Sequence, residues 1–88
     1  MRADKKQVLT ILNTAKGQIN GIVKMIEEDK YCIDISNQLL AVEALIKKAN
    51  QEVIKGHLEG CLKEAIINGE DLNQKIDEIM KTIAKMSK

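Results

Sequence analysis

Apolar residues recur every three or four positions along most of this 88-residue chain, which is the spacing of one face of an α-helix. The chain contains no proline, and the first glycine of its central part is Gly56. This pattern predicts one long central helix that begins near Cys32, runs through Ile67 and ends at Asn68-Gly69, a common C-terminal signal. Its expected apolar face consists of Ile35, Leu39, Val42, Ile46, Ala49 and Val53.

Two shorter helices are predicted on either side of the central one. The first begins after Asp4, which can cap it with Gln7 at the capping-box position, and it ends near Asp29 to Tyr31. Its expected apolar face consists of Val8, Ile11, Leu12, Ala15, Ile19, Ile22 and Ile26. The third begins at Asp71 and should pack back over the end of the central helix. Its expected apolar face consists of Leu72, Ile76, Ile79, Met80 and Ile83.

Composition agrees with a small all-α domain and adds the expectation of an oligomer. Tyr31 is the only aromatic residue, and a core of aliphatic residues and methionine is typical of a helical bundle. We expect one domain over residues 1–88, a size at which only about 60–65% of the unfolded surface is buried. Because a long central helix would leave apolar surface exposed in a monomer, we expect several copies to associate.

The charges are nearly balanced overall but uneven along the chain. A net charge of +1 gives no bulk attraction to nucleic acid or membrane. Residues 1–24 are locally basic, although a solvated face would explain this equally simply, and they contain Arg2, Lys5, Lys6, Lys16 and Lys24. Gly17 and Gly21 in the same helix should let another helix approach closely. The N-terminus lacks an apolar signal region, so a cytoplasmic location is expected.

The candidates for metal chemistry are the only two cysteines, Cys32 and Cys61, and the only histidine, His57. His57 and Cys61 stand four residues apart, so they share a helix face and could share a metal ion. Cys32 lies 25 residues before His57, about 37 Å away along a continuous helix. A site made of all three therefore requires two central helices packed antiparallel, with a two-fold axis generating it twice. Gly56 and Gly60 are expected to keep the space around the ligands open.

Two thiolates and one imidazole form a soft ligand set that favours Cu(I). Cu(I) accepts three such ligands, whereas Zn(II) normally completes a tetrahedron and would recruit a carboxylate or water. Nickel or cobalt would require more nitrogen and oxygen ligands. Simpler interpretations stay open at this point, since a lone cysteine is often a small buried hydrophobe and a lone histidine is often a surface residue. No nucleophile, base and orienting acid stand at a usable spacing, so an enzyme is not expected.

Three segments of the chain resemble the copper-sensitive operon repressors, whose relatives respond to nickel, cobalt, formaldehyde or reactive sulfur. They are KGQINGI at residues 16–22, MIEEDKYCID at residues 25–34 and HLEGC at residues 57–61, and the likeness covers about residues 8–80. The resemblance implies a three-helix protomer, a dimer built as an antiparallel four-helix bundle, and a homotetramer of two dimers. It also implies that the metal-free form binds operator DNA and that Cu(I), held between subunits by Cys32, His57 and Cys61, releases it.

The resemblance assigns roles to further residues. Tyr31 and a carboxylate of the third helix, Glu78 or the neighbouring Asp77, would surround the histidine and fix its orientation. The residues left to meet DNA phosphates would be Arg2, Lys5, Lys6, Lys16, Lys24, Lys47 and Lys48. Positions where repressors of this family usually carry arginine are here Ile11, Thr14 and Asn20. Two alternatives therefore stay open: a cytosolic Cu(I)-binding protein that does not touch DNA, and a repressor that senses reactive sulfur through its two cysteines.

Overall fold

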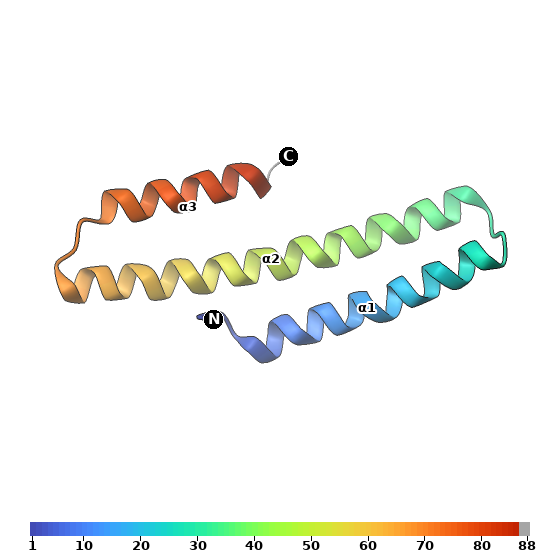
Figure 1. Cartoon of the computed structure of the whole chain (residues 1–88), viewed down its shortest axis with the longest axis horizontal. Helices are drawn as coiled ribbons and strands as arrows, with labels where there is room; N and C mark the ends of the chain where they lie inside the picture. Colours follow the sequence, from blue (N-terminus) through green and yellow to red (C-terminus); the bar gives the residue numbers. More distant parts are fainter. Residues whose placement is uncertain (87–88) are drawn as a thin grey trace.

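Three helices lie side by side in a single layer in the computed structural model, which describes residues 1–86 (Figure 1). They are α1 (Lys5–Glu27), α2 (Cys32–Asn68) and α3 (Leu72–Met86). The prediction of an all-α protomer with a long central helix is confirmed, and each helix begins within one residue of its predicted start. The principal-axis extents are 58 × 27 × 12 Å, and the shortest is about the diameter of one helix.

The helix ends form where the sequence placed them. The Asp4 carboxylate accepts a hydrogen bond from the Gln7 backbone N–H at 3.2 Å and so caps α1. Asp29 ends α1 in a left-handed conformation (φ 54°), which reverses the chain and sets α1 antiparallel to α2. Gly69 (φ 69°) ends α2 in the same manner, and the N–H of Glu70 then donates to the Ala65 carbonyl at 2.8 Å. Both reversals are tight, so each flanking helix runs back along α2.

The core between α1 and α2 consists of two small clusters. One contains Val8, Ile11 and Ala49, and the other contains Ala15, Ile22 and Val42. Several residues predicted for the apolar faces stay exposed instead, among them Ile19 (44%), Leu39 (51%) and Ile46 (49%). The reason is geometric: in a single layer each helix is covered on one side only, and these apolar stripes are wider than one neighbour can cover.

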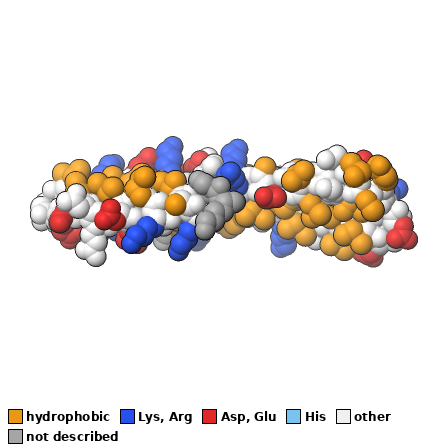
Figure 2. All heavy atoms as spheres, turned by 90° about the horizontal axis from the view of Figure 1, so that it is seen from above, with side chains coloured by type: hydrophobic (Ala, Val, Ile, Leu, Met, Phe, Trp, Pro, Cys, Tyr) orange, Lys and Arg blue, Asp and Glu red, His pale blue; other side chains and the backbone are white. Residues whose placement is uncertain are grey.

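Large apolar side chains are exposed along the whole molecule, from Leu9 and Ile26 of α1 to Ile67 of α2 and Met80 of α3. Figure 2 shows hydrophobic side chains gathered toward the α1–α2 turn, with few charged groups among them. The accessible surface of the protomer is 6805 Å², whereas a compact 9.8 kDa monomer exposes roughly 5,200 Å². Among residues 1–86, no helix is both long and apolar enough to cross a membrane.

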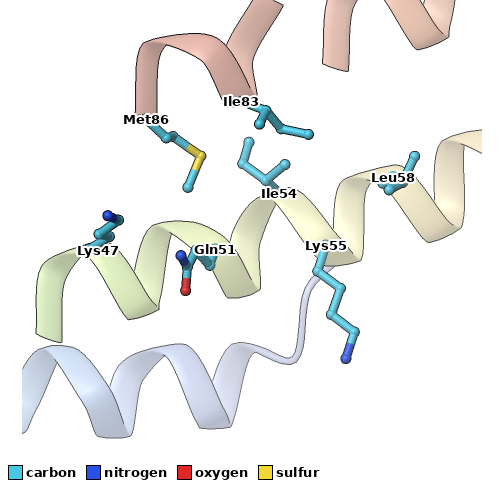
Figure 3. A pocket seen from close by; sticks show the side chains of 7 residues that line it. All are labelled: Lys47, Gln51, Ile54, Lys55, Leu58, Ile83 and Met86. Atoms are coloured by element: carbon cyan, nitrogen blue, oxygen red, sulfur yellow. The ribbon is translucent and has the colours of Figure 1, made fainter. Parts of the chain in front are cut away.

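Helix α3 runs back beside the C-terminal half of α2, as predicted, and among the described residues it makes no contact with α1. Near the C-terminal end of α3, a groove of about 380 Å³ lies between α3 and α2. In Figure 3, Ile54 and Ile83 point toward one another across this groove, and the Met86 sulfur points toward α2. None of the three predicted metal ligands lines the groove, so it is separate from the candidate metal centre.

The glycines of α1 and α2 have opposite surroundings. A Cβ added at Gly17 or Gly21 would meet nothing within 4 Å, so the predicted close approach of another helix does not occur within one chain. At Gly56 an added Cβ would collide with Ala3, and at Gly60 it would lie 2.7 Å from Arg2 Cδ. The prediction that this pair keeps the space open is therefore wrong. The space is filled by Arg2 and Ala3, which we call the N-terminal arm.

Two glycine-to-alanine substitutions should change stability in opposite directions. Gly56→Ala forces the backbone of Ala3 off α2, and we expect a loss of about 1–3 kcal/mol in the free energy of unfolding. Gly17→Ala meets open space on an exposed helix and should gain up to about 1 kcal/mol. Urea denaturation at one fixed protein concentration measures both. A Gly56→Ala variant as stable as the parent would show that the N-terminal arm is not packed on α2 in solution.

Candidate metal centre

Cys32 is the first residue of α2 and lies at one end of the molecule, beside the α1–α2 turn (Figure 1). It is exposed, and Tyr31 before it occupies the N-cap position without making a side-chain capping hydrogen bond. Asp34 in the first turn is favourably placed with respect to the helix dipole. Neither Cys32 nor Cys61 forms a disulfide within the chain, so neither thiol is consumed by one.

His57 and Cys61 lie on consecutive turns of α2, well beyond the middle of the helix. Cys61 is buried (6% exposed), whereas His57 is exposed. Helix α2 is unbroken over its 37 residues, as predicted, so Cys32 stays about 37 Å from His57 in the same chain. Within the part of the chain that the structure describes, no three His, Cys, Asp or Glu side chains converge into a metal-binding group. One chain therefore supplies the ligands but does not close the site.

The N-terminal arm crosses α2 at the turn that carries His57 and Cys61. Ala3 lies against Gly56 and packs on the first core cluster, and the Arg2 side chain passes over Gly60. Beyond Gly60 the Arg2 guanidinium donates to the Glu64 carboxylate at 2.7 Å. This contact was not predicted from the sequence, because Glu64 follows Arg2 by 62 positions and nothing in the local pattern pairs them. The only available signal was the pair of helical glycines, to which we assigned another purpose.

The residues expected to surround the histidine lie on two different elements. Tyr31 is 68% exposed at the start of α2. Glu78 and Asp77 are both exposed on α3, and Glu78 lines a polar cleft near the α2–α3 turn together with Glu70, Asp71, Gln74 and Lys75. Like the metal ligands, Tyr31 and the α3 carboxylates come from opposite ends of the protomer. Their predicted roles thus require a second chain as well.

The basic residues proposed for DNA binding are distributed over both long helices. Lys6 of α1 and Lys48 of α2 line one cleft of about 430 Å³, together with Thr10, Gln7, Asp4 and Ile11. Lys47 instead lines the groove between α2 and α3. Lys5, Lys16 and Lys24 are exposed on α1, where the Lys24 ammonium lies 3.9 Å from Glu28. Arg2 is engaged by Glu64, so the described surface presents lysine as its free cation.

Comparison with known proteins places the chain among metal sensors. Residues 4–85 match the protein family described as metal-sensitive transcriptional repressor. The chain is 37% identical over 79 residues to the copper-sensing transcriptional repressor CsoR of Mycobacterium ulcerans (strain Agy99), covering 90% of this chain and 67% of that protein. It is 35% identical over 85 residues to the Bacillus subtilis (strain 168) CsoR, covering 97% of this chain and 83% of that one.

A solved structure extends the likeness to three dimensions. The copper-sensing repressor CsoR with Cu(I) from Geobacillus thermodenitrificans NG80-2 superposes with a TM-score of 0.81 at 28% sequence identity. The match covers 100% of this chain and 94% of that one. The CsoR proteins of Mycobacterium bovis (strain BCG / Pasteur 1173P2) and Mycobacterium tuberculosis (strain ATCC 25618 / H37Rv) are 38% identical over 69 residues, and the matched part of this chain spans 58% of their length.

Proposed function

This chain belongs to the metal-sensitive transcriptional repressors, and from that premise we propose that it is a Cu(I)-responsive repressor. In this proposal the metal-free protein binds operator DNA, and Cu(I) held by Cys32, His57 and Cys61 releases it. The observation that carries the proposal is the position of these ligands on one unbroken helix, with Cys32 at its start and His57 and Cys61 in its second half. The likeness to copper-sensing relatives, one of them solved with Cu(I), supports copper as the signal.

The donor set fits Cu(I). Two free thiols and an imidazole are soft ligands in the number that Cu(I) accepts. When bound, the metal would join two chains by sulfur and nitrogen bonds that neither chain makes alone. Each chain then contributes to two sites. Its Cys32 supplies a thiol at the start of α2 to one site, and its His57 and Cys61 supply two donors from one face of α2 to the other site.

An antiparallel pair of α2 helices is the assembly that this geometry supports. If the two-fold axis passes between Leu45 and Ile46, Cys32 of one helix lies opposite Glu59 of the other. Glu59 stands between His57 and Cys61 in the sequence, so all three ligands then lie at the same height along the helix pair. Exposed apolar residues are available near that point, including Ile46 itself and Leu39. The protomer exposes roughly 1,600 Å² more than a compact monomer, about twice the 800 Å² that one partner contributes to a standard interface. A homodimer, and a homotetramer built from two of them, would bury this excess.

Operator DNA would be bound mainly through lysines. Lys6 and Lys48 from two helices meet at one cleft, and repetition by the two-fold axis would multiply this charge. Lysine neutralises phosphate as a point charge, but it lacks the planar fork with which arginine makes bidentate contacts. We therefore expect binding that depends strongly on salt concentration.

A DNA-binding titration tests the proposal directly. Reduced, metal-free protein should bind a duplex from its own promoter at low salt, and one equivalent of Cu(I) per protomer should abolish that binding. The same titration with a scrambled duplex of equal length measures specificity. Tight Cu(I) binding without detectable duplex binding would instead favour a Cu(I)-binding protein that does not regulate transcription, which the residues Ile11, Thr14 and Asn20 at usual arginine positions would explain.

A further inference from the structure

We propose that Arg2 withholds Glu64 from the metal centre and so helps the protein to select Cu(I) over divalent ions. The inference rests on the proposed function, because it concerns the same Cys32, His57 and Cys61 site. It assigns Arg2 and Glu64 a part in metal selectivity: Glu64 is a candidate for a fourth ligand on the helix that carries His57 and Cys61, and Arg2 keeps it engaged elsewhere.

Glu64 stands where a fourth ligand would be drawn from. It follows Cys61 by three positions and His57 by seven, so all three lie along one stripe of α2. Side chains on a helix lean toward its N-terminus, which directs a glutamate at position 64 over the turn that carries Cys61. A carboxylate added to two thiolates and an imidazole would complete the tetrahedron that Zn(II) and similar divalent ions prefer.

Arg2 binds Glu64 from a position that the glycines of α2 leave free for it. The guanidinium donates to Glu64 Oε2 at 2.7 Å, and the aliphatic part of the side chain lies over Gly60, where a Cβ would come within 2.7 Å of Arg2 Cδ. Ala3 fixes the arm by packing against Gly56. Among the described residues Glu64 does not converge with His57 and Cys61 into a metal-binding group. The only arginine of the chain is thus used at the metal-binding turn.

The charge of Arg2 acts in the same direction as its hydrogen bond. Cu(I) with two thiolates and a neutral imidazole has a net charge of −1, whereas a divalent ion with the same ligands is neutral. The Arg2 guanidinium lies against Gly60, the residue before Cys61, where it attracts the anionic complex and contributes nothing comparable to the neutral one. Both effects are moderated by solvent, because the Arg2 and Glu64 side chains are 37% and 64% exposed.

Co(II) is the probe of choice, because its absorption spectrum reports the number and type of its ligands. Reduced, metal-free full-length protein and its Arg2→Gln variant would be titrated with Co(II) and, by competition with a chelator of known affinity, with Cu(I). We expect Arg2→Gln to bind Co(II) about fivefold more tightly, with stronger bands of tetrahedral Co(II), and to bind Cu(I) no more tightly than the parent.

A second substitution identifies the ligand. In the Arg2→Gln/Glu64→Gln double variant the gain in Co(II) affinity and the tetrahedral bands should both disappear. Lys63→Gln is the matched control, because it removes one positive charge from an exposed residue of α2 outside the contact and should leave Co(II) affinity unchanged. The inference is overturned if Arg2→Gln gains no Co(II) affinity, or if the gain survives in the double variant. A parent protein that fails to bind Cu(I) would refute the proposed function itself.

Discussion

Replacing Cys32 with alanine is expected to lower the Cu(I) affinity of the protein more than about 100-fold. Removing a residue that only hydrogen-bonds to a metal ligand already lowers metal affinity by about 10–100-fold, and Cys32 is itself a proposed ligand. Cys32 is exposed at the first position of α2 and belongs to neither core cluster, so the helices should stay folded. Cu(I) should then fail to release the variant from operator DNA. Chelator competition measures the affinity, and far-ultraviolet circular dichroism confirms the fold.

Mixing two defective variants tests whether the site is shared between chains. Neither Cys32→Ala nor Cys61→Ala can form a complete site alone. A dimer of one with the other, however, retains an intact Cys32 on the Cys61→Ala chain and an intact His57 and Cys61 on the Cys32→Ala chain. After mixing, unfolding and refolding, about a quarter of the parent number of Cu(I) sites should return. If no sites return, the ligands do not come from two subunits in this arrangement.

The second large effect is expected from His57→Ala, and it should separate binding from regulation. Two thiolates can still hold Cu(I) linearly, so we expect Cu(I) to bind, with reduced affinity. Release from DNA should fail, because the imidazole is the donor whose orientation Tyr31 and Glu78 or Asp77 are proposed to fix. Fluorescence anisotropy of a labelled operator, recorded with saturating Cu(I), measures the response.

Controls for this experiment come from the neighbouring helix. Glu78→Gln and Asp77→Asn should be compared, because only the carboxylate that contacts His57 should reproduce part of the His57→Ala defect. Both residues are exposed, so neither substitution should unfold the protein. A His57→Ala protein that leaves DNA as readily as the parent would show that the histidine does not transmit the signal.

The sequence predicted the helices because their boundaries are set locally. Asp4 caps α1 through a hydrogen bond three residues away, and Gly69 ends α2 by adopting a conformation that costs glycine little. The length of α2 followed from the absence of breakers, and that length alone separates Cys32 from His57. Interactions between residues that are close in the sequence can be predicted from the sequence alone.

Contacts between distant segments were not readable in the same way. Gly56 and Gly60 signalled that something lies close to α2, but the sequence does not say what, and we expected open space. The structure places Ala3 and Arg2 there. Likewise the periodicity of α2 marked Leu39 and Ile46 as apolar without showing that a single layer leaves them exposed. Which apolar residues are buried depends on how many helices pack against a given helix, and hydrophobic periodicity alone does not give that number.

The thinness of the protomer has a consequence for the living cell. In the proposed assembly, a newly made chain keeps its apolar stripes exposed and its helices poorly supported until it meets another copy, and locally unfolded segments can be cut by proteases in the meantime. Association of two copies would then both protect the chain from proteolysis and complete the metal site. The lowest cellular concentration at which the protein functions would be set by its self-association constant. A strain producing less than that amount would lose the polypeptide itself before losing its copper response.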